Sequence, residues 1–414
     1  MPDLQTIVAA RRPLTLAGVP EGFQPAMLAD LARAAKGRVV FVVPDEAAMR
    51  ALAGTAGFFA PDLEVIDLPA WDCLPYDRAS PTLRIMAERI AALHALQRKV
   101  QRPQLVLTTV NAAMQRVLTP FRIRQLVASL KPGERIDRDR LAQLLQANGY
   151  VRTETVHDQG EYAVRGGIVD LYPSGEEQAL RLDFFGDEIE SVRTFDPQDQ
   201  RTTGRIDGFT LLPASEALLD EESIKRFRTR YREKFGATAT GDPLYQAISE
   251  GRRLAGMEHW LPLFEDRLAT LFDHLSPDDI VIRDSGVAKA AEARLEAVAD
   301  YHANRLRADV AQPGSYRPLA ANALYLPDAD WREALDAAAA HLTTPFTSPR
   351  VRRSSTSGST VRGTSRPSAP AVATSTRRWS RTSTASGATG ANRSWRATRR
   401  ARANGSATCS RIMG

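Results

Sequence analysis

Residues 38–44 read RVVFVVP, in which an arginine precedes an unbroken run of β-branched and aromatic side chains that ends in a proline. Residues 105–109, LVLTT, form a second short run of the same kind. Strands buried on both faces of a parallel sheet carry such continuous apolar runs, because helices cover both sides of the sheet. Around the two runs, residues 27–35, 45–53 and 82–96 show the apolar spacing of helices. The pattern therefore predicts an α/β fold with a parallel sheet.

The middle of the chain, residues 123–211, becomes β-rich after one helix at residues 138–147. A strand is expected over residues 161–172, and the pair Gly166-Gly167 within it could form a bulge that switches the facing of its side chains. The pair Gly186-Asp187 has the composition of a two-residue hairpin turn. These features predict a separate β-rich domain.

Residues 179–185 read ALRLDFF and alternate in the manner of a half-buried strand, with residues 188–195 as the returning partner strand. The core face would take the apolar members Leu180, Leu182 and Phe184. Arg181 and Phe185 would then lie on the opposite face. A large aromatic side chain is out of place on the polar face of a purely structural strand, and arginine with an aromatic ring is the composition of a protein-binding hot spot.

The stretch from residue 212 to 344 is mixed, with a charged helix at 221–235, a short strand at 279–284 and an alanine-rich helix at 286–302. These helices and this strand would complete the α/β unit that the first part of the chain begins. The β-rich domain between the two parts is therefore predicted to be an insertion. The expected domains are two parts of one α/β unit, the insertion between them and a terminal tail: 1–122, 123–211, 212–344 and 345–414.

The tail changes how the net charge of +6 is interpreted. Fourteen of the 55 basic residues are arginines at or after Arg350, where no Asp or Glu occurs, so residues 1–349 hold 41 basic residues against 49 acidic ones. Residues 345–414 have no apolar periodicity and are predicted to be disordered. They are either the out-of-frame translation of a GC-rich gene or a genuine basic tail. The second reading gives an alternative function, non-specific nucleic-acid binding through the arginine-rich tail.

No catalytic, metal or cofactor site can be assembled from the sequence. The best phosphate-loop candidate, residues 16–24 (LAGVPEGFQ), has Gly18 and Gly22 but places Phe23 and Gln24 where a lysine and a Ser or Thr are required. The histidines are scattered, and the two cysteines form no metal-binding pair. We therefore expect a chain that is not an enzyme, without a cofactor or metal. No membrane-spanning run or signal segment is apparent, which favours the cytoplasm.

Four unusual strings resemble the transcription-repair coupling factors of bacteria. Their sequences are LPAWDCLPYDRASP, GEYAVRGGIVDLYP, RLDFFGDEIESVRTFDP and GMEHWLPLF, at residues 68–81, 160–173, 181–197 and 256–264. The resemblance covers about 340 residues. It implies an N-terminal module similar to the repair protein UvrB, in which a degenerate helicase-like α/β domain is interrupted by a β-rich domain that recruits UvrA.

The family's UvrA contact maps onto three residues of this sequence: Arg165, Arg181 and Phe185. The family's RNA-polymerase-binding and ATP-driven DNA translocase domains would lie further along the chain, so this sequence is expected to be a truncated member without motor activity. A weak DNA contact by the α/β part is left open. The structural alternative is that both arginines pair locally with Asp183 or Glu190 and that Phe185 covers a neighbouring loop.

Overall fold

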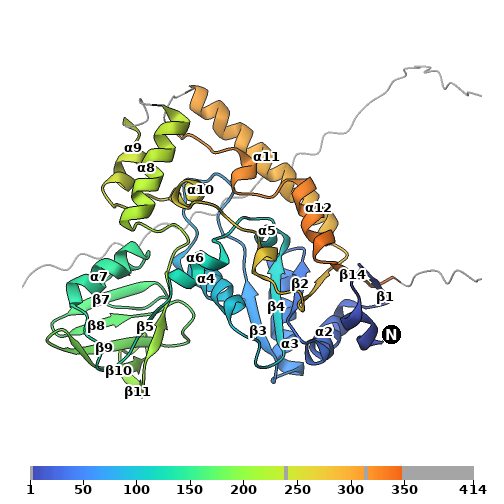
Figure 1. Ribbon diagram of the computed structural model, residues 1–414, viewed down its shortest axis with the longest axis horizontal. Coiled ribbons are helices and arrows are strands. Elements are labelled where there is room, and N and C mark those ends of the chain that lie inside the picture. The colour runs from blue at the N-terminus through green and yellow to red at the C-terminus, as the bar shows by residue number, and fades with distance from the viewer. Residues whose placement is uncertain (1–2, 237–240, 312–315, 347–414) are drawn as a thin grey trace, which may run out of the picture. The chain divides into compact units, whose positions relative to one another are not determined.

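The structure is a computed structural model that describes residues 3–236, 241–311 and 316–346 (Figure 1). The predicted tail lies outside the described residues from Thr347 onward. Within the described residues, no helix is long and apolar enough to cross a membrane.

One sheet contains six parallel strands and confirms the predicted α/β fold. In spatial order the strands are β1 (Thr15–Ala17), β14 (His341–Thr344), β13 (Ile280–Arg283), β2 (Val39–Val43), β4 (Gln104–Thr109) and β3 (Glu64–Leu68). Every residue of β2 is buried, as its continuous apolar run predicts. β13 and β14 lie in the same sheet as β1 to β4. The segment between β4 and β13 is therefore an insertion in this sheet.

Helices cover both faces of the parallel sheet (Figure 1). Val39, Phe41 and Val43 of β2 face one apolar core, and Val40 and Val42 face the other. The first core is shared with α1 (Leu4–Ala9), α2 (Gln24–Ala34) and α3 (Glu46–Phe59). The second is shared with α4 (Leu83–Gln97), α5 (Val110–Ala113), α11 (Val287–Ala311) and α12 (Asp328–Ala337).

The second large sheet is the β-rich part of the chain. Its order is β11 (Thr202–Ile206), β10 (Glu188–Phe195), β9 (Ala179–Phe185), β8 (Ile168–Leu171), β7 (Glu161–Arg165) and β6 (Val151–Arg152). The neighbours are antiparallel except β6 and β7. Its core face packs against α7 (Arg138–Ala147), and β5 (Ala128–Leu130) pairs with β12 (Phe209–Leu211) beside it. The observed bounds of α7, β9 and β10 are those predicted from the sequence.

The expected bulge at Gly166-Gly167 is wrong. Arg165 pairs with Ile168 across an antiparallel ladder, so the two glycines form the two-residue turn of a hairpin between β7 and β8. Gly166 has φ +57° and the equivalent Gly186 of the next hairpin has φ +64°, a backbone region that glycine adopts without strain. Ile168, the first residue of β8, pairs with Asp183 near the end of β9. The turn before β8 and the turn after β9 therefore lie at the same end of the sheet.

The remaining helices are mostly short, and the longest of them follows the insertion. α8 (Glu221–Phe235) has its predicted bounds and buries Phe227 and Tyr231, with the Phe227 ring 4.8 Å from that of Phe264. The others are α6 (Pro120–Gln125), α9 (Pro243–Ser249), α10 (Leu261–Phe264) and the 3-10 helices η1 (Glu21–Phe23), η3 (Met257–Trp260), η4 (Leu271–His274) and η5 (Ala321–Ala323).

A buried ion pair connects the end of the insertion to the parallel-sheet unit. Arg89 of α4 and Glu216 are both fully buried, and the Arg89 Nε and Nη2 atoms lie 2.9 and 3.1 Å from the two Glu216 carboxylate oxygens. The Trp71 indole N–H donates to the same carboxylate at 2.6 Å, and Arg89 Nη1 donates to the Pro69 carbonyl at 2.7 Å. Three segments distant in the sequence therefore meet at one carboxylate.

We expect Glu216→Ala to lower the free energy of unfolding by about 3 to 5 kcal/mol, because Arg89 would keep its charge in the core without a partner. Urea denaturation followed by tryptophan fluorescence measures this loss. Glu88→Ala is the matched control, since Glu88 pairs on the surface with Arg84 and its loss should stay below about 1 kcal/mol. Similar small losses for both variants would contradict the structural role of Glu216.

The buried ring of His259 should make stability depend on pH. Neither ring nitrogen has a hydrogen-bond partner among the described residues, and burial lowers the pKa of His259 to about 4. Below about pH 6.5 the unfolded chain binds a proton at this site while the folded chain does not, so stability is lost as the pH falls toward 4. Between pH 7 and pH 5 the free energy of unfolding should fall by about 2 kcal/mol more in the unaltered chain than in His259→Gln. Parallel pH dependences, with the exposed His157→Gln as control, would overturn this assignment.

Candidate functional site

The candidate site is the outward face of the sheet formed by β7 to β10. The predicted phasing of β9 is confirmed, because Leu180 and Leu182 are fully buried in the domain core and Phe184 packs against it. Arg181 and Phe185 project to the opposite side of the same strand. Register places Asp170 of β8 directly opposite Arg181, on this outward face.

Asp170 is the centre of the face, although the sequence reasoning did not identify it. Its side chain is 0% exposed. Oδ1 accepts from Arg181 Nε at 2.7 Å, and Oδ2 accepts from Arg181 Nη2 at 3.0 Å. Oδ2 also accepts from Arg165 Nη2. One buried carboxylate thus holds both of the predicted arginines.

The local pairing differs from the structural alternative considered from the sequence. Asp183 does not take either predicted arginine as its hydrogen-bonding partner, because it binds Arg193 of β10 through contacts of 2.8 and 2.6 Å. Burial by itself would raise the pKa of Asp183, but the hydrogen bonds from Arg193 and the Ser191 hydroxyl outweigh it and leave that pKa below its usual value. Asp183 and Arg193 therefore extend the charged network of the face by one more strand.

Arg181 is more enclosed than its neighbours. Its side chain is 14% exposed, and its guanidinium carbon lies 4.8 Å from the centre of the Phe195 ring. The hydrogen bonds to Asp170 raise the pKa of Arg181 above its usual value. Arg165, whose side chain is 48% exposed, is the more accessible of the two predicted arginines.

Phe185 is 81% exposed at the end of β9. The Phe184 N–H donates to the Gly167 carbonyl at 2.8 Å, so Phe185 lies level with the glycine turn between β7 and β8. The glycine beside it has no side chain that could cover the ring. This ring therefore does not cover a neighbouring loop, which was the structural alternative for it.

The other end of the face is closed by a small apolar cluster. Its members are Val156, Ala163, Ala179 and Phe195, with Tyr172 packed against them. The accessible part of the face is consequently the end near the two hairpin turns, where Arg165 and Phe185 lie. The signal that could have identified Asp170 is its place in the strand sequence IVDL, where a carboxylate interrupts an apolar strand.

The phosphate-loop candidate has the expected strand, loop and helix but not the required side chains. Gly18 follows β1, and Gly22 lies in η1 immediately before α2. Gln24 is buried at the start of α2 and donates through Nε2 to Asp284 Oδ2 at 3.0 Å. A carboxylate at this position repels phosphate, and the loop offers no lysine to compensate. These residues do not fit a bound nucleotide.

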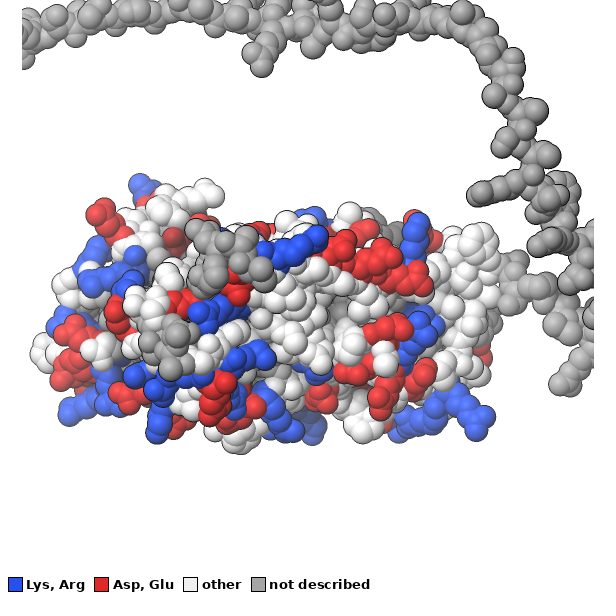
Figure 2. All heavy atoms as spheres, turned by 90° about the horizontal axis from the view of Figure 1, so that it is seen from above, with Lys and Arg blue, Asp and Glu red and all other residues white. Residues whose placement is uncertain are grey.

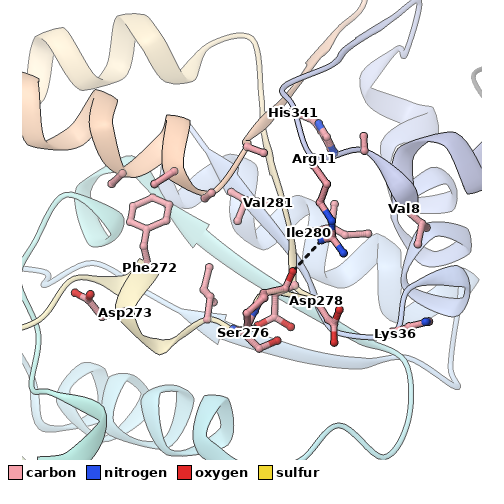
Figure 3. Close-up of a pocket in the computed structure, with 18 of the residues that line it drawn as sticks. Val8, Arg11, Lys36, Phe272, Asp273, Ser276, Asp278, Ile280, Val281 and His341 are labelled. Carbon is pink, nitrogen blue, oxygen red and sulfur yellow. Dashed lines mark hydrogen bonds between the residues drawn. The ribbon is translucent and has the colours of Figure 1, made fainter.

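A cavity of about 930 Å³ lies elsewhere, beside the amino ends of β13 and β14. Figure 3 shows Arg11, Asp278 and Lys36 toward one side of it and Phe272 and Asp273 toward the other. Arg11 Nη1 donates to the Pro277 carbonyl at 3.2 Å. None of the predicted site residues lines this cavity. The groups of His, Cys, Asp and Glu in the described residues include none suited to a metal ion.

The face shown in Figure 2 carries Lys and Arg side chains interspersed with Asp and Glu. A nucleic-acid surface would be expected to concentrate one sign of charge. The mixture on this face therefore gives no support to a phosphate-binding surface there.

Comparison with known proteins identifies the β-rich part. Residues 128–216 match the family described as the UvrB interaction domain. This match begins at the first residue of β5 and ends at Glu216, whereas the sequence reasoning placed the domain at 123–211.

Curated relatives extend the similarity to the parallel-sheet unit. The chain is 41% identical over 221 residues to the transcription-repair-coupling factor of Haemophilus influenzae, which is 53% of this chain and 19% of the relative. For the Escherichia coli protein of that name the values are 36% over 267 residues, 64% and 23%. For that of Rickettsia bellii they are 30% over 298 residues, 72% and 26%. The chain spans about a fifth to a quarter of these relatives, and it carries the UvrB interaction domain within the similar region.

The two arginines should differ in their effect on stability. Arg181→Ala would remove two hydrogen bonds from the buried Asp170 carboxylate, and we expect the free energy of unfolding of the β-rich domain to fall by about 3 kcal/mol. Arg165→Ala leaves the two bonds from Arg181 in place and should cost about 1 kcal/mol or less. Hydrogen exchange of the β8 and β9 amides measures both losses. Equal losses would contradict the unequal burial of the two side chains.

Proposed function

We propose that this chain is a docking module that recruits UvrA in transcription-coupled nucleotide-excision repair, through the outward face of β7 to β10. The observation that carries the proposal is the pair of accessible groups at the hairpin end, Phe185 at 81% exposure and Arg165 at 48%. The match of residues 128–216 to the UvrB interaction domain supports a protein partner for this domain. The similarity to transcription-repair-coupling factors supports the repair context.

The chemistry of the face suits a protein with an apolar pocket beside a carboxylate. Burying the Phe185 ring would contribute about 1.5 to 3 kcal/mol, because nearly all of the ring is in water in the free chain. The Arg165 guanidinium can form a charge-assisted hydrogen bond to a carboxylate at the edge of that pocket. Arginine and a large aromatic side chain are the residue types that most often dominate protein interfaces.

The proposal assigns no catalysis to this chain. The phosphate-loop candidate lacks the required lysine and hydroxyl side chains. The Asp284 carboxylate lies beside it and accepts a hydrogen bond from Gln24. Motor activity is therefore not part of this proposal. RNA polymerase binding and DNA contact are also left out of it. With this role the chain would act in the cytoplasm. The alternative, nucleic-acid binding through the arginine-rich tail, falls on residues outside the described part of the chain and is not favoured by the comparisons.

Phe185→Ala and Arg165→Ala in the full chain should each weaken UvrA binding by about 1 to 2 kcal/mol in titration calorimetry, because each removes one accessible contact group. Phe58→Ala is the matched control, since Phe58 of α3 is also 81% exposed but lies on the parallel-sheet unit. Arg84→Ala serves the same purpose for Arg165, with Arg84 exposed on α4. Affinities unchanged by the two site variants, or lowered equally by the controls, would refute the proposed docking face.

A further inference from the structure

Asp170 is a buried carboxylate on the outward face, between the apolar cluster that closes one end and the accessible hairpin end. The Asp170 side chain is 0% exposed. Arg165 and Asp183, which lie two positions beyond its partners on the two neighbouring strands, are partly accessible. Both carboxylate oxygens accept hydrogen bonds from guanidinium groups. A buried charge is costly in a protein and persists only where its partners are placed around it. The arrangement therefore calls for a reason beyond the packing of the domain core, which lies on the other side of the sheet.

The two guanidinium groups held by Asp170 are not equivalent. Arg181 has its Nε and Nη2 on Asp170, its Nη1 3.4 Å from the Gln200 carbonyl and its plane against the Phe195 ring. Arg165 makes one hydrogen bond to Asp170, through Nη2. Its remaining N–H groups have no hydrogen-bond partner among the described residues, and about half of the side chain is in water. Arg181 is enclosed by the domain, whereas Arg165 still has donors to offer.

The charges on the face also separate the two arginines. Asp183 is matched to Arg193 through two hydrogen bonds, and Asp170 is matched to Arg181 through two. Of the three arginines in this network, Arg165 therefore carries the surplus positive charge. A partner that matches the network needs one carboxylate, placed opposite Arg165.

We infer that Asp170 and Arg181 are positioning residues, which hold the Arg165 guanidinium beside Phe185, and that Arg165 and Phe185 are the groups that touch the partner. This inference rests on the proposed function. A free arginine loses rotamer entropy when a partner fixes it, and an arginine already anchored by one hydrogen bond loses less. Asp170 thus raises affinity without a contact of its own.

The partner surface follows from the same geometry. It presents a single carboxylate at the rim of an apolar pocket that accepts a phenyl ring. Two carboxylates, one for each arginine, would place one negative charge near the buried Asp170 carboxylate without a free guanidinium to neutralise it.

A double-mutant cycle in the full chain tests the inference, with UvrA as the titrant in calorimetry. Asp170→Asn should weaken binding about tenfold, and Arg165→Ala should do the same. The double variant Asp170→Asn with Arg165→Ala should bind no more weakly than Arg165→Ala alone, because Asp170 acts through Arg165. Asp170→Asn combined with Phe185→Ala should instead weaken binding by about the product of the two single effects, since Phe185 does not depend on Asp170.

Asp183→Asn is the matched control, because it removes a carboxylate from the same face without a hydrogen bond to Arg165. The inference is overturned if Asp170→Asn leaves the affinity unchanged, if its effect adds to that of Arg165→Ala, or if Asp183→Asn shows the same non-additivity. Should Asp170→Asn fail to fold, Arg181→Lys keeps a positive charge beside Asp170 and replaces it in the cycle. It should weaken binding only while Arg165 is present, and an equal effect in its absence would equally overturn the inference.

The outcome also separates this inference from the proposed function. If Phe185→Ala and Arg165→Ala weaken binding and Asp170→Asn does not, the docking face stands and the positioning role is wrong. If the unaltered chain does not bind UvrA, or if neither Phe185→Ala nor Arg165→Ala changes the affinity, the proposed function itself is wrong.

Discussion

The buried contact between Arg89 and Glu216 determines how the two sheets are joined. Glu216 lies just beyond the last strand of the insertion, and its carboxylate receives both a guanidinium and the Trp71 indole N–H. The same return segment is fixed from the other side, because the Tyr150 hydroxyl donates to the Leu212 carbonyl at 2.7 Å and the Ser174 hydroxyl to the Pro213 carbonyl at 2.8 Å. Side chains of both units thus hold one short stretch of chain, the parallel-sheet unit through the Glu216 carboxylate and the insertion through two backbone carbonyls. A segment held in this way does not act as a flexible linker.

The local elements of this fold were predictable because their signals are local. The alternation in ALRLDFF placed β9 and its core face, and the apolar periodicity of residues 221–235 gave the bounds of α8. Gly166-Gly167 was misread because two glycines inside a β-like run suit a bulge and a turn equally, and only the pairing of Arg165 with Ile168 distinguishes them. The resemblance to a known family supplied the three site residues; their part in binding a partner stays a prediction, with Arg181 now assigned to holding Arg165 through Asp170.

What the sequence could not predict are the contacts between distant residues. Trp71, Arg89 and Glu216 come together from three segments, and no periodicity links them. Asp170 is eleven positions from Arg181 and pairs with it only because β8 and β9 are antiparallel in that register. The local pairing proposed for Arg165 and Arg181 had the right kind of interaction and the wrong acid, since both arginines bind Asp170.

The boundary of the UvrB interaction domain has a consequence for any attempt to excise or transplant it. A graft of residues 128–216 would remove Glu216 from its host and leave the Arg89 guanidinium in an apolar interior without a counter-ion. The host, rather than the transplanted piece, would bear most of the damage, because the released Glu216 could be hydrated at the new chain end. The cut that respects the chemistry falls before the return segment, so that Leu212 to Glu216 stay with the parallel-sheet unit.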